Sequence, residues 1–432
     1  MSWARSSTGL GTKGTGTSGP YGRLAPLRPD GRWNGAAALP KSLLQRSFAR
    51  NSLLRRMDGV LLATVLALSL IGMLLIWSST SATLREQGSD PRTYLYKQLI
   101  NVVIGLLLML GVTVLDYRQL RTYAPVLYGV SLLGLVAVLV VGTPVNGSKS
   151  WITVPGGNQI EPSEFGKLAL ILMAAAFLSE MRNANGRPTR RAIIMTLGMA
   201  IVPLALVAKE PDLGVAIVML LTVLGLIALS GIKLRWLGVG VAGGALGVLA
   251  VFKLHLLKAY QLGRLTAFLH PDADPQGSGY SAAQAKVAIG SGGVFGQGLF
   301  HGSLISGNFI PEQHTDFIFA VAGDELGFVG AAAIIVLLAL VLLRALRIAA
   351  RADDQFGMLV ATGIAIWFAF QAFVNIGMTI GIMPITGLPL PFISYGGSAA
   401  FADMIAIGLL QSVHRKRTGL SAAFSLRTPN AR

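Results

Sequence analysis

Two ionisable residues stand inside an otherwise apolar stretch of the chain. Glu164 and Lys167 lie three residues apart in segment 163–181, and on a helix this spacing places both side chains on one face. Ionisable groups inside a membrane are costly and are functional sites by default. The spacing therefore favours a functional acid–base pair, with a self-neutralising structural pair as the alternative.

A second candidate site lies in the long segment 256–313, in the run HPDADPQGSGY at 270–280. Asp274 precedes Pro275, which disfavours a helical conformation at the aspartate, and two glycines that follow allow sharp turns. A carboxylate held in this way can serve as a general base. The alternative is a plain turn with capping aspartates.

Metal ligands are sparse along the chain. Asp272 and Asp274 form a D-x-D pair that could touch a divalent ion, Mg²⁺ or Mn²⁺, bound to a diphosphate, although such pairs are common in turns. His314 and Asp316 could be two metal ligands, but no third ligand stands at helical spacing, which argues against a zinc site. The sequence therefore leaves a divalent cation possible and establishes no cofactor.

The composition shows which solvent surrounds these residues. Of 432 residues, 53% are hydrophobic and 13% are charged, and mean hydropathy is +0.62. Ordinary soluble domains carry about 25% charged residues, so this chain is expected to lie mainly in a bilayer. It has no cysteine, which excludes disulfides, thiolate nucleophiles and Fe–S clusters.

Uncharged runs predict an all-α, polytopic membrane protein with ten transmembrane helices. A helix needs about 20 apolar residues to cross the hydrocarbon core. The 48 uncharged residues between Asp354 and Asp403 are too many for one helix, and Pro384, Pro389 and Pro391 split them into two. The other predicted spans lie near 59–84, 98–115, 122–148, 163–181, 191–208, 212–231, 235–255 and 318–343.

Charge placement predicts the domain organisation and the orientation. Residues 1–57 form a basic tail, expected to be disordered; residues 58–415 form the membrane domain, and 416–432 form a short basic tail. The tails and the short loops on their side hold 26 of the 36 Lys and Arg residues. By the positive-inside rule both termini are cytoplasmic, and the large loop 256–313, between helices 7 and 8, is extracytoplasmic. A nucleic-acid-binding tail is disfavoured because few aromatic residues interleave its basic ones.

Known catalytic motifs of several enzyme classes are missing. The chain contains no G-x-x-x-x-G-K-[ST], so it is not its own ATPase, and no H-E-x-x-H or G-x-S-x-G. What remains is an acidic and basic constellation at one membrane surface. This suits a transporter or an enzyme that acts on a lipid-linked substrate.

Over about residues 58–415 the chain resembles the SEDS family (shape, elongation, division, sporulation), which includes RodA and FtsW. The run from Phe309 to Gly330 is the most specific match, and NIGMTIGIMPITGLPLPF at 375–392 is more similar to the RodA, elongation-type branch. The family usually has Gln where Glu161 and Glu210 stand here. The matching stretches are NGSKSWI at 146–152, IEPSEFGKLA at 160–169, EPDLG at 210–214, DPQGSGY at 274–280, GSGGVFGQGL at 290–299, FIPEQHTDFIFAVAGDELGFVG at 309–330 and PLPFISYGGSA at 389–399.

The resemblance implies a peptidoglycan glycosyltransferase of the bacterial plasma membrane. Such an enzyme polymerises lipid II, the undecaprenyl-diphosphate-linked disaccharide-peptide, on the extracytoplasmic face, and a class B penicillin-binding protein, a transpeptidase, activates it. The invariant acid of the family maps onto Asp274. The helix-four acid and base map onto Glu164 and Lys167, and the acid of EPDLG maps onto Asp212.

The reaction implied by this resemblance assigns roles to further residues. Exchange of an α-linked diphosphate for a β-1,4 bond requires inversion, so one general base, Asp274, and an in-line leaving group suffice. Arg264, Lys286, Lys167 or a divalent cation would stabilise the departing diphosphate. His314, Asp316 and Ser394, in two of the matching stretches, are further expected substrate-binding residues.

Two other function classes stay open at this stage. Ten helices and polar residues at mid-helix also suit a lipid II flippase or a secondary transporter, although such a carrier would not need the loop that bears Asp274. A non-catalytic scaffold for cell-wall enzymes is the third class. The glycine-rich stretch 290–307 is expected to be either a mobile cover over the glycan or a plain linker.

Overall fold

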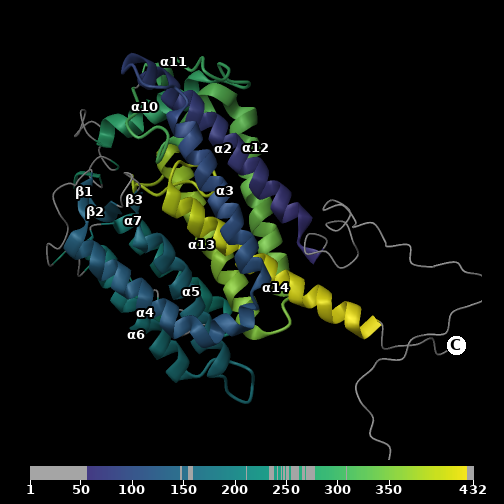
Figure 1. The fold of residues 1–432 in the computed structure, drawn as a ribbon. Helices are drawn as coiled ribbons and strands as arrows, with labels where there is room; N and C mark the ends of the chain where they lie inside the picture. The colour runs from purple at the N-terminus through teal and green to yellow at the C-terminus, as the bar shows by residue number, and fades with distance from the viewer. Residues whose placement is uncertain are drawn as a thin grey trace, which may run out of the picture.

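The structure is a computed structural model that consists mainly of long helices packed side by side (Figure 1). It describes residues 56–145, 148–153, 159–210, 212–232, 278–307 and 309–425, with a few isolated positions between 238 and 268. The basic tail predicted at 1–57 falls almost entirely outside these ranges, so its disorder stays a prediction.

Among the described residues, seven helices are long and apolar enough to cross a membrane. They confirm the predicted all-α membrane class. The shorter apolar α7 (Leu213–Leu229) and the C-terminal α14 (Gly397–Ser425) complete the described bundle. The span predicted near 235–255 lies mostly outside the described residues, so the count of ten stays a prediction. The seven helices are α2 (Gly59–Glu86), α3 (Thr93–Val114), α4 (Tyr117–Val141), α5 (Pro162–Glu180), α6 (Arg190–Lys209), α12 (Ile318–Ala350) and α13 (Gln355–Ile380).

Small elements gather at one end of the bundle, which we call the loop end (Figure 1). A three-stranded antiparallel sheet in the order β1–β2–β3 departs from the purely helical expectation, because Gly142 and Pro144 interrupt the helical pattern after α4. At the opposite, terminal end, α2 begins and α14 ends. The loop-end elements are β1 (Thr143–Val145), β2 (Ser148–Thr153), β3 (Gln159–Ile160), α10 (Ser278–Ser291) and α11 (Ser303–Ser306).

Helix boundaries follow from local chemistry. The side chains of Asp58 and Asp212 each accept a hydrogen bond of 3.0 Å from a first-turn amide of the helix that follows, which satisfies one of the donors left over at a helix start. The run between Asp354 and Asp403 is split as predicted. Helix α13 ends at Gly381, which has a φ of 82° that glycine adopts without strain, and α14 begins beyond the three prolines.

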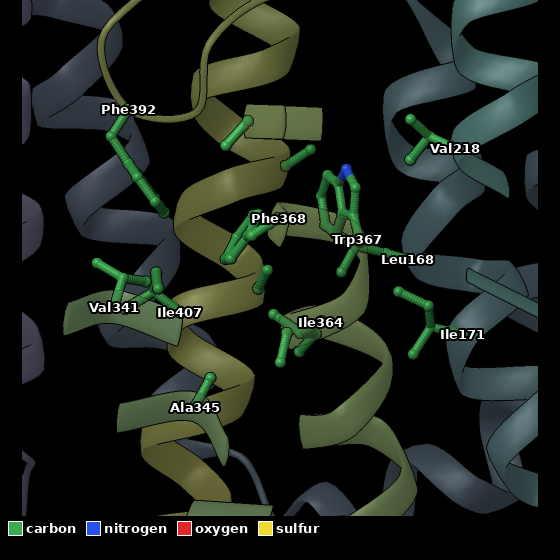
Figure 2. Close-up of a cluster of buried hydrophobic side chains, with 14 of the residues drawn as sticks. Leu168, Ile171, Val218, Val341, Ala345, Ile364, Trp367, Phe368, Phe392 and Ile407 are labelled. Atoms are coloured by element: carbon green, nitrogen blue, oxygen red, sulfur yellow. The ribbon is translucent and has the colours of Figure 1, made fainter. Parts of the chain in front are cut away.

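Helices α5 and α13 form the centre of the bundle. In their most apolar windows, 78% and 72% of the residues are buried, against 17% in α4. Leu168 and Ile171 of α5 lie among side chains of the neighbouring helices, including Trp367 of α13 (Figure 2). Polar groups on α5 and α13 are therefore shielded from both water and lipid.

The glycine-rich stretch that follows α10 is bound along α12. The amides of Gln297 and Gly298 donate to carbonyls of α12, each at 2.9 Å, and Phe328 of α12 donates to the Gly293 carbonyl at 2.9 Å. These bonds meet at Gly327, whose φ of 68° interrupts the helix. The backbone of residues 293–298 is thus part of the packed fold, which disfavours the mobile-cover interpretation.

At the terminal end, an ion pair joins the start of α2 to α12. The Arg344 Nε donates to both carboxylate oxygens of Asp58, at 3.2 and 2.9 Å. Gln411 of α14 completes the contact by exchanging two hydrogen bonds with the Asp58 backbone, at 2.7 and 3.0 Å. Because the side chain of Asp58 is only 3% exposed, loss of the arginine would leave a buried charge without its partner.

We expect Arg344→Met to destabilise the protein by about 2–3 kcal/mol. The value is below the roughly 3–5 kcal/mol of a fully buried pair because Arg344 is 23% exposed. Thermal unfolding in detergent measures the change. The matched control is Arg121→Met, which breaks the exposed pair with Glu180 and should cost no more than about 1 kcal/mol. Equal shifts in the two variants would contradict the assignment.

Candidate active site

Glu164 and Lys167 form the predicted pair on α5, within the centre of the bundle. The Lys167 Nζ lies 2.7 Å from Glu164 Oε1, and both side chains are 1% exposed. The lysine also donates to Gln371 Oε1 at 2.8 Å and lies 4.8 Å from the ring centre of Trp367. A charge pair in such surroundings requires several polar partners to offset the loss of water.

Gln371 and Trp367 are partners that sequence reasoning missed. The Trp367 Nε1–H donates to Gln371 Oε1 at 2.6 Å, and Gln371 Nε2 donates to the carbonyl of Pro389 at 2.9 Å. Gln371 therefore connects the lysine on α5 with α13 and with the linker between α13 and α14. Neither residue is charged, so no charge pattern could identify it.

Acidic side chains meet beside this pair, where α5 and α7 begin. Ser163 donates to Glu161 at 2.7 Å, and Glu161 is hydrogen-bonded to Asp212. Burial, together with the carboxylates of Glu164 and Asp212, raises the pKa of Glu161 well above its usual range. The raised pKa favours Glu161 as the donor of this hydrogen bond and Asp212 as its acceptor.

The other acids of the EPDLG stretch are also perturbed. Burial raises the pKa of Asp212, and the hydrogen bond from the Val215 amide opposes the shift. Burial and the neighbouring Asp212 raise the pKa of Glu210 to about 8. Glu161 and Glu210 stand where the resemblance leads us to expect Gln. Their raised pKa values favour the protonated forms, which lessens the negative charge that they add to the site.

Asp316 lies just before α12, beside Arg264 at Gly387 in the α13–α14 linker. The Asn375 Nδ2 donates to the backbone carbonyl of Asp316 at 2.8 Å and holds this turn against α13. Burial, then the Glu312 carboxylate, raises the pKa of Asp316 to about 7, and the charge of Arg264 opposes the shift. The structure therefore brings Asp316, Arg264 and Asp212 into one electrostatic neighbourhood, and their role in binding substrate stays a prediction.

Ser394 and His314 hold the segment before α12 in place. The Ser394 hydroxyl donates to the carbonyl of Thr315 and accepts from the amide of Leu390, each at 2.7 Å. The His314 ring packs against Tyr94 and Tyr395, with centroid distances of 4.9 and 5.6 Å. These contacts give Ser394 a positioning role, and its contact with substrate stays a prediction.

Lys286 lies apart from the buried pair, on an exposed face of α10. Its side chain packs over Gly381 at the end of α13, so closely that a Cβ there would meet the lysine Cε. The lysine is therefore held at the loop end, near the surface.

Two predicted features fall outside the part of the chain that the structure describes. Asp274 and Asp272 precede the described residues of α10, so the assignment of the general base stays a prediction. Within the described residues, no group of three or more His, Asp or Glu side chains could hold a metal ion. A divalent cation therefore has no ligand set among them.

Asp403 is a further buried acid, for which the sequence analysis predicted no role. It lies on α14, near enough to Glu164 and Lys167 to interact with both electrostatically. Its Oδ2 accepts the amide of Phe392 at 3.2 Å, and Phe392 has a φ of 66°, which is strained for a residue with a side chain. Asp403 thus stabilises the turn that precedes Ser394.

Comparison with known proteins places this arrangement among cell-wall enzymes. The family model described as "Cell cycle protein", for FtsW, RodA and SpoVE, matches residues 59–419. The chain is 37% identical to the probable peptidoglycan glycosyltransferase FtsW of Trichlorobacter lovleyi over 358 residues, which are 82% of this chain and 92% of that relative. It is also 37% identical to the peptidoglycan glycosyltransferase MrdB of Escherichia coli K12 over 365 residues, 84% of this chain and 95% of that relative.

The fold also has a solved counterpart. A chain described under "Structural coordination of polymerization and crosslinking by a peptidoglycan synthase complex" is 34% identical, with a TM-score of 0.69. The similarity covers 84% of this chain and 98% of the solved one. Because the two relatives above are equally similar, the RodA, elongation-type branch stays a prediction.

We expect Lys167→Met to destabilise the protein by about 3–5 kcal/mol, because it leaves Glu164 buried without its counter-charge. The double variant Glu164→Gln with Lys167→Met should recover most of that loss, since it removes both charges. Thermal unfolding in detergent, compared across the single and double variants, measures the coupling. A double variant no more stable than Lys167→Met would contradict the pairing.

The raised pKa of Asp316 predicts a pH dependence of stability. The folded protein holds this proton up to about pH 7, whereas the unfolded chain releases it near pH 4. Stability from this group is therefore fully present below about pH 4 and lost as the pH rises through 7. Unfolding midpoints at pH 5 and pH 8 should differ less in Asp316→Asn than in the wild type, the remaining slope coming from Glu161 and Glu210. An unchanged difference would contradict the shift.

Proposed function

Because the chain belongs to the cell cycle protein family of FtsW, RodA and SpoVE, we propose that it polymerises lipid II into glycan strands and releases undecaprenyl diphosphate. It is a membrane-embedded peptidoglycan glycosyltransferase. The observation in the fold that carries the proposal is the buried Glu164–Lys167 pair beneath the acids where α5, α7 and α12 begin. The buried pair and these acids together support a polar site at the loop end.

The reaction joins the 4-hydroxyl of an acceptor GlcNAc to the anomeric carbon of a donor MurNAc. An alcohol is a weak nucleophile, so a positioned carboxylate should take its proton as the bond forms, which typically contributes about 10²–10⁴-fold. Asp274 is our candidate for this base. The bond from the anomeric carbon to the diphosphate breaks as the new bond forms, with inversion.

The departing diphosphate needs positive charge at the loop end. Arg264 beside Asp316 is well placed, because its NH1 donates to the carbonyl of Thr386 at 3.4 Å and is thereby fixed at the α13–α14 linker. Lys286 lies at the same end of the bundle. Lys167 is bound to Glu164 and Gln371, so we assign it to organising the site and its electrostatic potential.

The proposal includes a partner and an orientation. The solved chain similar to this one belongs to a complex of polymerisation and crosslinking, which supports a class B penicillin-binding protein as the partner transpeptidase. The excess of Lys and Arg at the terminal end supports cytoplasmic termini and an extracytoplasmic site. No nucleic acid is part of the proposal, and the elongation role follows only from the predicted RodA-like branch.

We expect Asp274→Asn to abolish formation of glycan polymer from purified lipid II, because an amide cannot accept the proton of the attacking hydroxyl. The assay uses the full chain in detergent micelles, with and without its transpeptidase, and gel analysis of the products. Asp90→Asn is the matched control, since Asp90 is exposed and its cap to the Arg92 amide is one that Asn can also make.

Three outcomes separate the function classes. Polymer from the wild type and from Asp90→Asn, but none from Asp274→Asn, supports the proposal. Full activity of Asp274→Asn removes that residue from its role. No polymer from the wild type in micelles, even with its partner, rejects the polymerase and leaves a flippase or a scaffold.

A further inference from the structure

An open pocket of about 160 Å³ lies at the loop end between α2, α3 and the segment before α12. Its walls include Thr83 and Gln87 at the end of α2, Tyr94 in the first turn of α3, and Glu312 and His314. Sequence reasoning did not identify this pocket, because its walls come from segments more than 200 residues apart. None of its residues belongs to the buried pair or to the acids around Asp212.

The polar groups that line the pocket are mostly uncharged, and Glu312 is the carboxylate among them. The structure gives no hydrogen-bond partner among the described residues to the side chains of Thr83 and Gln87, or to the Tyr94 hydroxyl. The floor is fixed, because Gln313 Nε2 donates to the carbonyl of Ser79 at 2.6 Å. A rigid floor with available hydroxyl and amide groups is suited to a ligand rich in hydroxyl groups, which it would bind through directed hydrogen bonds.

Glu312 marks one wall and is held in a strained conformation. Its φ is 52°, in the left-handed region that non-glycine residues rarely adopt. The amides of Thr315 and Asp316 donate to its carbonyl, at 3.2 and 3.1 Å, and the Thr315 hydroxyl lies 3.1 Å from its carboxylate. Strain that the surrounding structure maintains tends to occur at ligand sites, and Glu312 adds a carboxylate to the pocket lining.

Charge separates this pocket from the site proposed for the diphosphate. No Lys or Arg occurs among its described lining residues, and it carries a carboxylate, so it would repel a diphosphate. Arg264 instead lies beside Asp316. Asp316 follows Glu312 in the same segment, only a few residues further along the chain. The short stretch from Glu312 to Asp316 thus contributes to two places. One is the pocket, which has no Lys or Arg among its described lining residues, and the other is the site that holds Arg264.

We propose that this pocket binds one uncharged N-acetylhexosamine ring of the glycan substrate. The proposal rests on the glycosyltransferase function and assigns a saccharide subsite to it. The size agrees, since 160 Å³ is below the roughly 300–1,000 Å³ of pockets that enclose a whole drug-sized ligand. Hydroxyl and acetamido groups of the ring pair with Thr83, Gln87 and Glu312, and the ring itself lies near Tyr94 and His314.

The test uses the double variant Thr83→Val with Gln87→Leu, which keeps side-chain volume and removes two hydrogen-bonding groups. The matched control is Thr122→Val with Gln119→Leu, which makes the same changes at exposed positions of α4, away from the pocket. We expect the pocket variant to raise KM for lipid II about tenfold with kcat within about twofold. The control should behave as the wild type, and unfolding midpoints of all proteins should agree.

A binding measurement separates this subsite from the polymerase proposal. The probe is the GlcNAc tetramer, and saturation-transfer NMR measures its binding to the full chain in detergent. Wild type, Asp274→Asn and the α4 control should all bind it, and the pocket variant should lose about tenfold in affinity. Unchanged KM and unchanged probe binding in the pocket variant would overturn the subsite while leaving the polymerase intact. If the wild type makes no polymer, the polymerase fails, and probe binding alone decides whether a saccharide subsite exists.

Discussion

The rest of the site depends on one interaction, the ion pair of Glu164 and Lys167, which is buried away from water. Desolvation of two charges costs several kcal/mol for each ion, and only close pairing with further hydrogen bonds offsets it. Glu164 and Lys167 meet at 2.7 Å, and Gln371 supplies the additional partner. This requirement fixes α5 against α13, and through the Gln371 bond to Pro389 it also fixes the linker that leads to Ser394.

Four helices begin around this pair, and the residues at their starts supply polar groups to the loop end. The starts of α5, α7 and α12 carry Glu161, Asp212 and the turn with Asp316, and Ser398 in the first turn of α14 lies 2.9 Å from the Glu161 amide. Helix N-termini stabilise negative charge. The acids at these helix starts tolerate burial partly by retaining protons, as the raised pKa values of Glu161 and Asp316 indicate. In the proposed function, this lowers the fixed negative charge that an anionic diphosphate would meet at the site.

The segment before α12 joins the two halves of the proposed substrate site. One part faces the neutral pocket at the ends of α2 and α3, and Asp316 faces Arg264 and the α13–α14 linker. Ser394 and Tyr395 hold this segment through the carbonyls of Thr315 and His314. A polymerase needs to hold a neutral glycan and a charged leaving group at a fixed separation, and a rigid segment between two subsites meets that need.

The sequence by itself determined the membrane class, the family, the split of the long apolar run at its prolines and the pairing of Glu164 with Lys167. These follow from composition, local motifs and spacing along one helix, where three residues already fix a shared face. Asp274 was likewise chosen from sequence and is still a prediction. Only the tertiary structure disclosed Gln371, Trp367 and Asp403 as partners of the pair, the positioning role of Ser394 and the neutral pocket. These contacts join residues from 11 to more than 200 positions apart, on different helices or on the linkers between them. The packing of helices and linkers decides these contacts, and no local periodicity encodes that packing.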